Sequence, residues 1–179
     1  MNAPSSITSR VLLSPYSPLW PAIFDYERAH LAQVLGEDVR IEHIGSTAVP
    51  GLGAKPIIDV MAGAPDIAHI EARIPALQAC GYQYVPEFER AIPERRYLRR
   101  TDGQPGNFHL HAVAEGSAFW IAHLAFRDAL RGNSALAEEY WKLKQRLAAR
   151  FPDDREAYTE GKGDFIRKVL ETRKVLKMR

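Results

Sequence analysis

The sequence predicts an α+β protein in which helices flank a mixed or antiparallel sheet and a helical part follows at the C-terminus. Short β-branched or alternating segments are interleaved with segments of helical periodicity up to about residue 115, and from Ser117 onward the pattern is almost wholly helical. At 179 residues and 46% hydrophobic, the chain is long enough for one well-formed core and too short for two independent domains. We therefore expect one domain over 1–179, with an α/β core over about 11–115 and helices over about 117–179 packed on it.

The first part of the chain contains one long helical pattern and several short strand patterns. Apolar residues recur at helical spacing from Trp20 to Leu35, and Gly36 ends that pattern. A second helical pattern runs from Ile67 through Gln78 and is expected to end at Gly81. Strands are predicted at 39–44, 57–61, 82–85, 94–100 and 108–113, the last two as an antiparallel pair around a turn at 101–106.

The C-terminal part predicts three helices. The first carries Phe119 to Ala125 and is expected to end near Gly132, and the second runs to about Leu147. The third is expected to carry Tyr158 through Val175, although Gly161 and Gly163 weaken its middle by about 1 kcal/mol each relative to alanine. Glycine at these positions indicates either a close approach to the sheet or a ligand, or a kink or helix boundary.

A turn of small residues, Gly45-Ser46-Thr47, follows the strand at 39–44 and is expected to bind phosphate. Glycine lets a ligand approach the backbone closely, and N–H groups at such a turn can hold phosphate oxygens beside the two hydroxyl groups. Lys55, just before the next strand, also suits an anionic ligand. These four residues are therefore predicted to contact a nucleotide or a phosphorylated small molecule.

Asp59 lies within the apolar run Ile57–Met61, where an ionised carboxylate needs a cation or good hydrogen-bond donors. His109 and His111 are two residues apart on a predicted strand, so their side chains project to the same face. Two histidines arranged in this way can chelate a metal ion. If the two strands are neighbours, Asp59, His109 and His111 converge, and this donor set suits Zn²⁺, Mn²⁺ or Fe²⁺ better than Mg²⁺. The expected cofactor of the site as a whole is a divalent metal: Mg²⁺, Mn²⁺ or Zn²⁺. The histidines could instead bind phosphate or fill a half-exposed sheet face. We expect Asp59 and His111 to be the catalytic residues.

Two further candidates depend on which face of a strand meets the pocket. Glu42 and His43 point to opposite sides, so only one can face it, and His43 is our candidate ligand-binding residue. On the arginine-rich strand, Arg96 shares one face with Leu98 and Arg100, whereas Arg95, Tyr97 and Arg99 share the other. Either face could offer guanidinium groups to phosphate, or the strand could be a solvated edge; Arg96 is our candidate contact.

Composition favours a small anionic ligand over large charged partners. The net charge is +2, which gives no global basic field, so we expect no binding to genomic nucleic acid. The single cysteine, Cys80, excludes an intrachain disulfide. The N-terminal residues lack the apolar segment of a signal peptide, and no run approaches the roughly 18 apolar residues of a membrane span. We therefore expect a cytoplasmic protein without a membrane partner.

The segment from Glu42 to Asp59, the strand 108–113, the run 126–131 and the C-terminal Tyr158 and Lys162 resemble the GrpB family. Proteins of that family look like members of the polymerase-beta-type nucleotidyltransferase superfamily, so the resemblance implies a nucleotidyltransferase-like sheet. Arg127 and Lys162 match family positions on predicted helices and are our candidates for ligand or scaffold contacts.

The wider superfamily holds two divalent ions with carboxylates one residue apart on a strand. Here the residue that shares a face with Asp59 is Met61, whose thioether is a poor Mg²⁺ ligand.

These observations lead to three hypotheses about function. The first is a transferase that holds phosphate at the Gly-Ser turn and a metal at Asp59. The second is a nucleotide- or phosphate-binding module without turnover, and the third is a metal-dependent hydrolase built on Asp59, His109 and His111.

Overall fold

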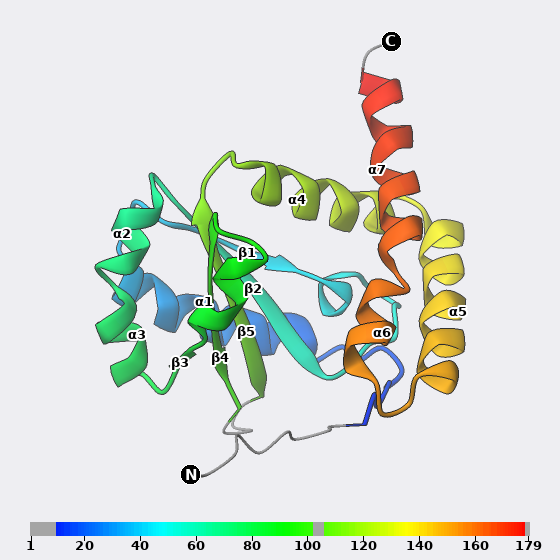
Figure 1. Ribbon diagram of the computed structural model, residues 1–179, viewed down its shortest axis with the longest axis horizontal. Helices are drawn as coiled ribbons and strands as arrows, with labels where there is room; N and C mark the ends of the chain where they lie inside the picture. Colours follow the sequence, from blue (N-terminus) through cyan, green and yellow to red (C-terminus); the bar gives the residue numbers. More distant parts are fainter. Residues whose placement is uncertain (1–9, 102–105, 178–179) are drawn as a thin grey trace.

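The computed structural model describes residues 10–101 and 106–177, and its centre is a five-stranded sheet (Figure 1). The strand order is β1-β2-β5-β4-β3; β2 and β5 are parallel, and the other neighbours are antiparallel. The sheet is therefore mixed, as expected. The strands are β1 Arg40–Ile44, β2 Ile57–Ala64, β3 Gln83–Tyr84, β4 Arg95–Arg100 and β5 Asn107–Ala114.

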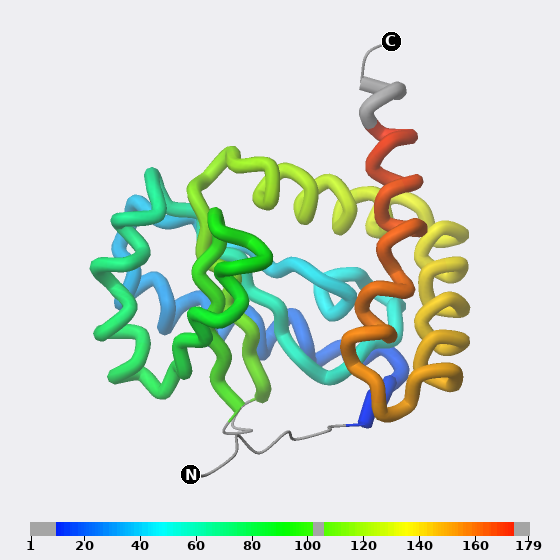
Figure 2. The backbone as a smooth tube through the Cα atoms, in the orientation of Figure 1, coloured from blue at the N-terminus to red at the C-terminus, as the bar shows by residue number. Residues whose placement is uncertain are grey.

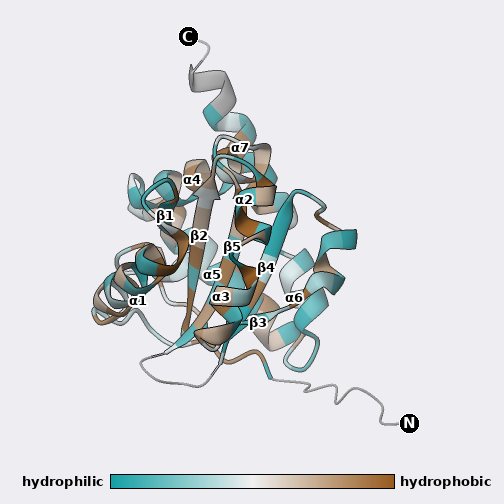
Figure 3. Cartoon of the chain, turned by 90° about the vertical axis from the view of Figure 1, so that its left-hand side faces the viewer, coloured by the Kyte–Doolittle hydropathy of each residue, from teal (hydrophilic) through white to brown (hydrophobic). Residues whose placement is uncertain are grey.

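One face of the sheet packs against helices from the first part of the chain. These are α1 Trp20–Leu35, α2 Ile67–Glu71 and α3 Ile74–Ala79. Their apolar side chains form the main core with alternate residues of the two central strands, such as Val60 and Leu110, both fully buried. Figure 3 shows apolar residues on these central strands and a hydrophilic β4 beside them. Strand alternation thus sends every second residue of β2 and β5 into this core.

The other face of the sheet meets the C-terminal helices. They are α4 Ala118–Arg131, α5 Ser134–Arg150, α6 Arg155–Glu160 and α7 Gly163–Lys177. Trp120 of α4 packs on Ile44, Met61 and Val113 at one end of this face. Asp59, His109 and His111 lie farther along the same face, because they are separated from Met61 and Val113 by even numbers of residues. The α+β class with a helical C-terminal part is confirmed.

Two predicted helices are each interrupted. The helix expected from Ile67 to Gln78 is two helices, because Pro75 has no N–H to donate to the carbonyl of Glu71 and its ring would clash there. The helix expected from Tyr158 to Val175 is also two, α6 and α7, and Gly161 and Lys162 lie between them. The glycine at 161 therefore marks a helix boundary, where it also contacts Leu147 closely. Most of the turn expected at 101–106 lies outside the described residues.

The first described segment joins the sheet to the C-terminal helices. Ser14 and Ala54 form an isolated antiparallel bridge, and the backbone N–H of Val11 donates to the carbonyl of Pro152 at 2.8 Å. Figure 2 shows this segment beside the connection between α5 and α6. No helix in the described part of the chain is long and apolar enough to cross a membrane.

Candidate functional site

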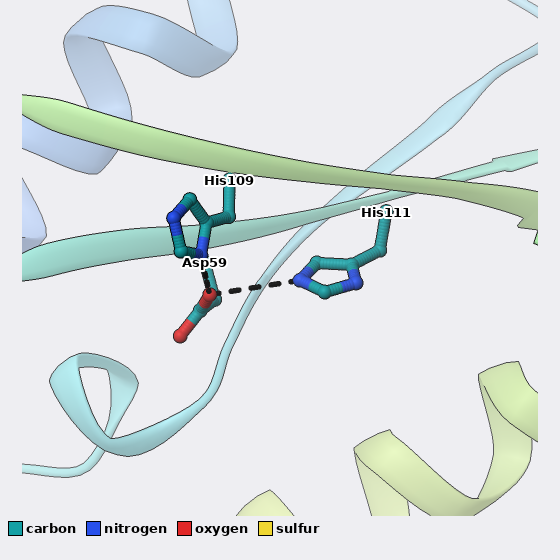
Figure 4. Close-up of side chains that lie close together, drawn as sticks. All are labelled: Asp59, His109 and His111. Atoms are coloured by element: carbon teal, nitrogen blue, oxygen red, sulfur yellow. Dashed lines mark ion pairs between the residues drawn. The ribbon is translucent and has the colours of Figure 1, made fainter. Parts of the chain in front are cut away.

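Asp59 and the two histidines of β5 form a compact cluster on the sheet face that meets the C-terminal helices. Asp59 and His109 are register partners in the parallel β2–β5 pair, so their side chains stand next to each other. The Nδ1 atom of His109 lies 3.3 Å from Oδ1 of Asp59, and Nε2 of His111 lies 3.6 Å from the same oxygen (Figure 4). One donor atom from each residue falls within 4.8 Å of the other two. The predicted convergence of these residues is present.

The histidines determine the charge of Asp59. Burial alone would raise the pKa of its carboxyl group, but hydrogen bonds from His109 and His111 outweigh burial and hold the pKa far below its usual range. Burial lowers the pKa of His111 in spite of its contact with Asp59. Asp59 is therefore held as an ionised carboxylate and His111 is favoured as a neutral imidazole, the protonation states in which these groups bind metals.

The turn at Gly45-Ser46-Thr47 lies directly against Asp59. Gly45 has a φ of +71°, and a Cβ built on it would overlap the Asp59 carboxylate, so both the backbone conformation and the space favour glycine. Thr47 is buried, and its hydroxyl donates to the carbonyl of Ile57 at 3.2 Å. The hydroxyl also lies 3.0 Å from Nε2 of His43. Thr47 thus fastens the turn to both flanking strands.

Two arginines of α4, one helical turn apart, bind carbonyl groups on either side of this turn. Arg127 donates to the carbonyl of His43 at 3.0 Å, and Arg131 donates to the carbonyl of Ala48 at 2.8 Å. Arg127 also pairs with Glu42 at 2.7 Å and with Asp128 at 2.8 Å. Because both ends of the turn are held from the same helix, α4 fixes the position of the turn relative to Asp59.

A cavity of about 340 Å³ lies between the sheet and the C-terminal helices, and its lining includes the Asp59 cluster, the Gly45–Thr47 turn and Arg127. Four further lining residues form what we call the cationic wall: Lys55, Lys144, Arg155 and Lys162. Asp59 is the one carboxylate among the described residues that line the cavity. None of the ion pairs in the described part of the chain involves these three lysines. The cavity therefore presents an excess of positive charge.

Burial favours the neutral form of each of the three lysines when no anion is present. Burial, with Arg155 and Lys162 nearby, lowers the pKa of Lys55 to about 8. Burial also lowers the pKa of Lys144 to about 7, and Lys162 and Lys55 contribute to that change. The pKa of Lys162 is lowered by burial as well, against the opposing effect of Asp59. An anion in the cavity would relieve the repulsion among these groups.

The structure brings together most of the residues that the sequence indicated. Nine of them line the cavity: Gly45, Ser46, Thr47, Lys55, Asp59, His109, His111, Arg127 and Lys162.

His43 and Arg96 lie elsewhere, and the structure corrects their expected positions. His43 lies on the opposite face of the sheet, stacked on Phe24 at 4.5 Å between ring centroids. Arg96 lies on that same opposite face and pairs with Glu71 at 2.7 Å. Strand alternation correctly predicted which residues share a face. It did not predict which of the two faces lines the cavity, because that depends on which helices cover each side of the sheet.

Sequence reasoning missed several residues that line the cavity. Lys144 is buried on the apolar side of α5 between Tyr140 and Leu147, and its amino group donates to the carbonyl of Gly53. A lysine in the apolar stripe of an amphipathic helix was the available signal. His123 and Arg155 also line the cavity. They come from α4 and α6, and their positions depend on how those helices dock.

The site lacks a second carboxylate on β2, because the residue that shares a face with Asp59 is Met61. Its side chain is fully buried with Ile44, Val113 and Trp120. Glu42, its register partner on β1, is held by Arg127 and Arg40 and does not line the cavity. The described cavity therefore combines one carboxylate and three imidazoles, two of them beside Asp59, with a cationic wall.

Fold and site together define an α+β protein with a cavity, lined by several cationic side chains, against one sheet face. The family model described as GrpB protein matches residues 10–172, and the chain belongs to the GrpB family.

Two relatives and one solved structure illustrate this relationship. UPF0157 protein YqkA of Bacillus subtilis is 37% identical over 160 residues, which cover 89% of this chain and 46% of YqkA. Glutamate-rich protein GrpB of Alkalihalophilus pseudofirmus is 33% identical over 89% of this chain and 94% of its own length. The crystal structure of conserved protein GrpB from Enterococcus faecalis has a TM-score of 0.79 and 36% identity, and the match covers 90% of this chain and 96% of that one. This chain thus spans less than half of YqkA and nearly all of the other two.

A more distant likeness is to the Cid1 poly(U) polymerase, with 13% identity and a TM-score of 0.44 over 73% of this chain and 45% of that one. A likeness of this size does not bear on activity or substrate.

Proposed function

We propose that the cavity binds a nucleotide or a phosphorylated small molecule together with a divalent cation, and that it transfers a phosphoryl or nucleotidyl group. One observation carries the proposal: the Asp59, His109 and His111 cluster, the Gly45–Thr47 turn and the residues of the cationic wall all line a single cavity. Group transfer between phosphates requires positioning and charge neutralisation more than covalent chemistry by the protein. Both requirements are met by residues of this cavity.

The donor atoms of the cluster suit a metal ion. Metal–nitrogen and metal–oxygen bonds of about 2.1 Å place two ligands of one ion roughly 3.0–3.5 Å apart. The distances of 3.3 Å and 3.6 Å from Asp59 Oδ1 to the two histidines fall in or close to this range. A carboxylate with two imidazoles favours Zn²⁺ or Mn²⁺ over Mg²⁺. Such an ion would neutralise charge on a phosphate and polarise its phosphorus–oxygen bonds.

The cationic wall suits the rest of a polyphosphate. Lys55, Lys144 and Lys162 come from three different segments and are half-buried or buried, so their charges are only weakly screened by solvent. A buried ammonium group without a carboxylate partner is costly unless a ligand supplies the negative charge. The wall therefore supports an anionic ligand over a neutral one, and it disfavours a hydrolase that uses the metal cluster alone.

Met61 is the observation that favours the alternative of binding without turnover. A second carboxylate at that position would help to hold a second metal ion, and the buried thioether does not. The two functions share the same pocket, so they differ only in whether product forms.

Calorimetric titration of the purified protein with each of the four nucleoside triphosphates, with and without Mn²⁺, tests the proposal. We expect one of them to bind at least tenfold more tightly with Mn²⁺, and Asp59→Asn to abolish that metal dependence. The matched control is Asp25→Asn, which changes an exposed aspartate on α1. Release of pyrophosphate or of a nucleoside diphosphate from the bound triphosphate then separates a transferase from a binding module. Absence of binding by all four nucleotides would refute the nucleotide proposal.

A further inference from the structure

A second hollow of about 380 Å³ adjoins the Asp59 cavity, and its charged lining is also cationic. Arg10, Lys55, Arg99 and Arg155 reach it from four separate segments: the first described residues, the start of β2, β4 and α6. None of the described residues that line it is acidic. Four positive charges from distant parts of the sequence around one hollow indicate an anionic occupant.

The two hollows adjoin, because four residues line both of them. These residues are Lys55, Ile57, His109 and Arg155. His109 also belongs to the candidate metal cluster, so the second hollow begins beside the place where a metal-bound phosphate would lie. A group in the second hollow could therefore reach a reacting atom in the first.

The guanidinium group of Arg99 differs from those of its neighbours on the arginine-rich strand. Arg96 and Arg100 point to the opposite face of the sheet, where each pairs with a carboxylate at 2.7 Å. Arg99 is exposed on the face of His109, its register partner, and its Nε donates to the side-chain oxygen of Gln83 at 2.9 Å. None of the described ion pairs involves Arg10, Arg99 or Arg155. These guanidinium groups have donors available for a ligand.

We infer that the second hollow binds the acceptor of the transfer reaction and that this acceptor carries a phosphate group of its own. The inference rests on the proposed function, because it assigns the donor nucleotide to the Asp59 cavity. A hydroxyl oxygen of the acceptor forms a bond to a phosphorus of the donor, and the bond from that phosphorus to the leaving phosphate oxygen breaks. The leaving group, which is pyrophosphate when a nucleotidyl group is transferred and a nucleoside diphosphate when a phosphoryl group is transferred, keeps the electron pair. The hydroxyl proton passes to water. Arg10 and Arg99 hold the acceptor's own phosphate away from this reaction.

Two phosphate-bearing probes test the inference and distinguish a small molecule from the end of a single strand. The full chain is first saturated with Mn²⁺ and a nucleoside triphosphate that has a methylene group between its α- and β-phosphorus atoms, so that it is not cleaved there. It is then titrated with ribose 5-phosphate or with a single-stranded RNA hexamer. We expect at least one probe to bind, and Arg99→Gln to weaken it about tenfold while triphosphate affinity stays within twofold. The probe that binds more tightly identifies the source of the phosphate.

Matched variants make the outcomes decisive. Arg146→Gln, which changes an exposed arginine on α5 away from both hollows, should leave both affinities unchanged. The inference is overturned if neither probe binds to the saturated protein, if a probe displaces the triphosphate, or if Arg146→Gln weakens the probe as much as Arg99→Gln does. Triphosphate binding without probe binding would refute this inference alone. Probe binding that depends on Arg99 without any triphosphate binding would make the hollow an anion site and not an acceptor site, and would refute the proposed function as well.

Discussion

Gly45 lies so close to Asp59 that a Cβ atom at position 45 would overlap the Asp59 carboxylate. The turn that is expected to hold phosphate and the carboxylate that is expected to hold metal are therefore in direct contact. The contact joins β2 to the turn after β1, and it fixes the distance between an anion on the turn and a cation on Asp59.

We predict that Gly45→Ala is more damaging than the same change at Gly51. Both glycines have positive φ, +71° and +78°, so alanine costs about 1–2 kcal/mol of strain at either position. A Cβ at Gly51 would meet no heavy atom within 4 Å, whereas at Gly45 it meets Asp59. The overlap should add about 1–3 kcal/mol to the loss of stability and weaken Mn²⁺ binding. Urea unfolding and metal titration of both variants measure the difference. Equal losses would show that the contact with Asp59 has no consequence.

The metal cluster predicts that the two β5 histidines contribute to transition-metal affinity together with Asp59. His109→Ala and His111→Ala should each lower the affinity for Zn²⁺ or Mn²⁺ by tenfold or more, because each removes one of three donor atoms. His30→Ala, in a partly exposed position on α1, is the control and should change nothing. Competition with a chromophoric chelator measures the metal affinity of each variant. A metal affinity that is the same in all three variants would exclude this cluster as the binding site.

The lysines of the cationic wall predict that the affinity of the cavity for an anion falls as pH rises. Without ligand, burial holds the pKa of Lys55 near 8 and that of Lys144 near 7, and a bound anion raises both. Above about pH 7 the complex then holds more protons than the free protein. For each proton that is taken up on binding, the affinity for the anion falls by up to about tenfold per unit of pH increase.

Sulfate is a suitable probe for this effect because its charge does not change in this range. Titrations at pH 6.5 and 9.5 should show weaker binding at the higher pH. Lys55→Met should reduce the pH dependence, while Lys142→Met, an exposed lysine on α5, should leave it intact. Binding that strengthens with pH would contradict the assignment of these lysines to the anion site.

The features that sequence could predict are those set by local periodicity. The helix from Trp20 to Leu35 and the central strands follow from the spacing of apolar residues. The convergence of Asp59 with His109 and His111 followed from strand alternation once β2 and β5 were assumed to be neighbours. Local patterns therefore sufficed for the sheet side of the cavity.

The features that sequence could not predict depend on which elements cover each sheet face. Alternation placed Arg96 and Arg99 on different faces, but only the docking of α2 beside Arg96 shows that Arg99 is on the cavity side. His43 was misplaced for the same reason, since α1 covers its face. Lys144 reaches the cavity because α5 docks beside the loop that contains Gly53, whose carbonyl accepts a hydrogen bond from the lysine. This contact is distant in the sequence, so no local pattern identifies the partner of the lysine.

The buried ion pair between Glu27 and Arg100 predicts a large effect on stability without an effect on the site. Glu27 of α1 is fully buried, and its carboxylate accepts hydrogen bonds from Arg100 at 2.7 Å and from the hydroxyl of Tyr82 at 2.6 Å. Glu27→Leu should cost about 3–5 kcal/mol because it removes the carboxylate from a buried guanidinium group. Tyr82→Phe should cost about 1 kcal/mol, and Asp25→Asn, which changes an exposed ion pair on the same helix, less than about 0.5 kcal/mol. Because this network lies on the sheet face opposite Asp59, the metal affinity of each folded variant should equal that of the unmodified protein. Chemical unfolding and metal titration test both statements, and a loss of metal affinity in Tyr82→Phe would show that the two sheet faces are coupled.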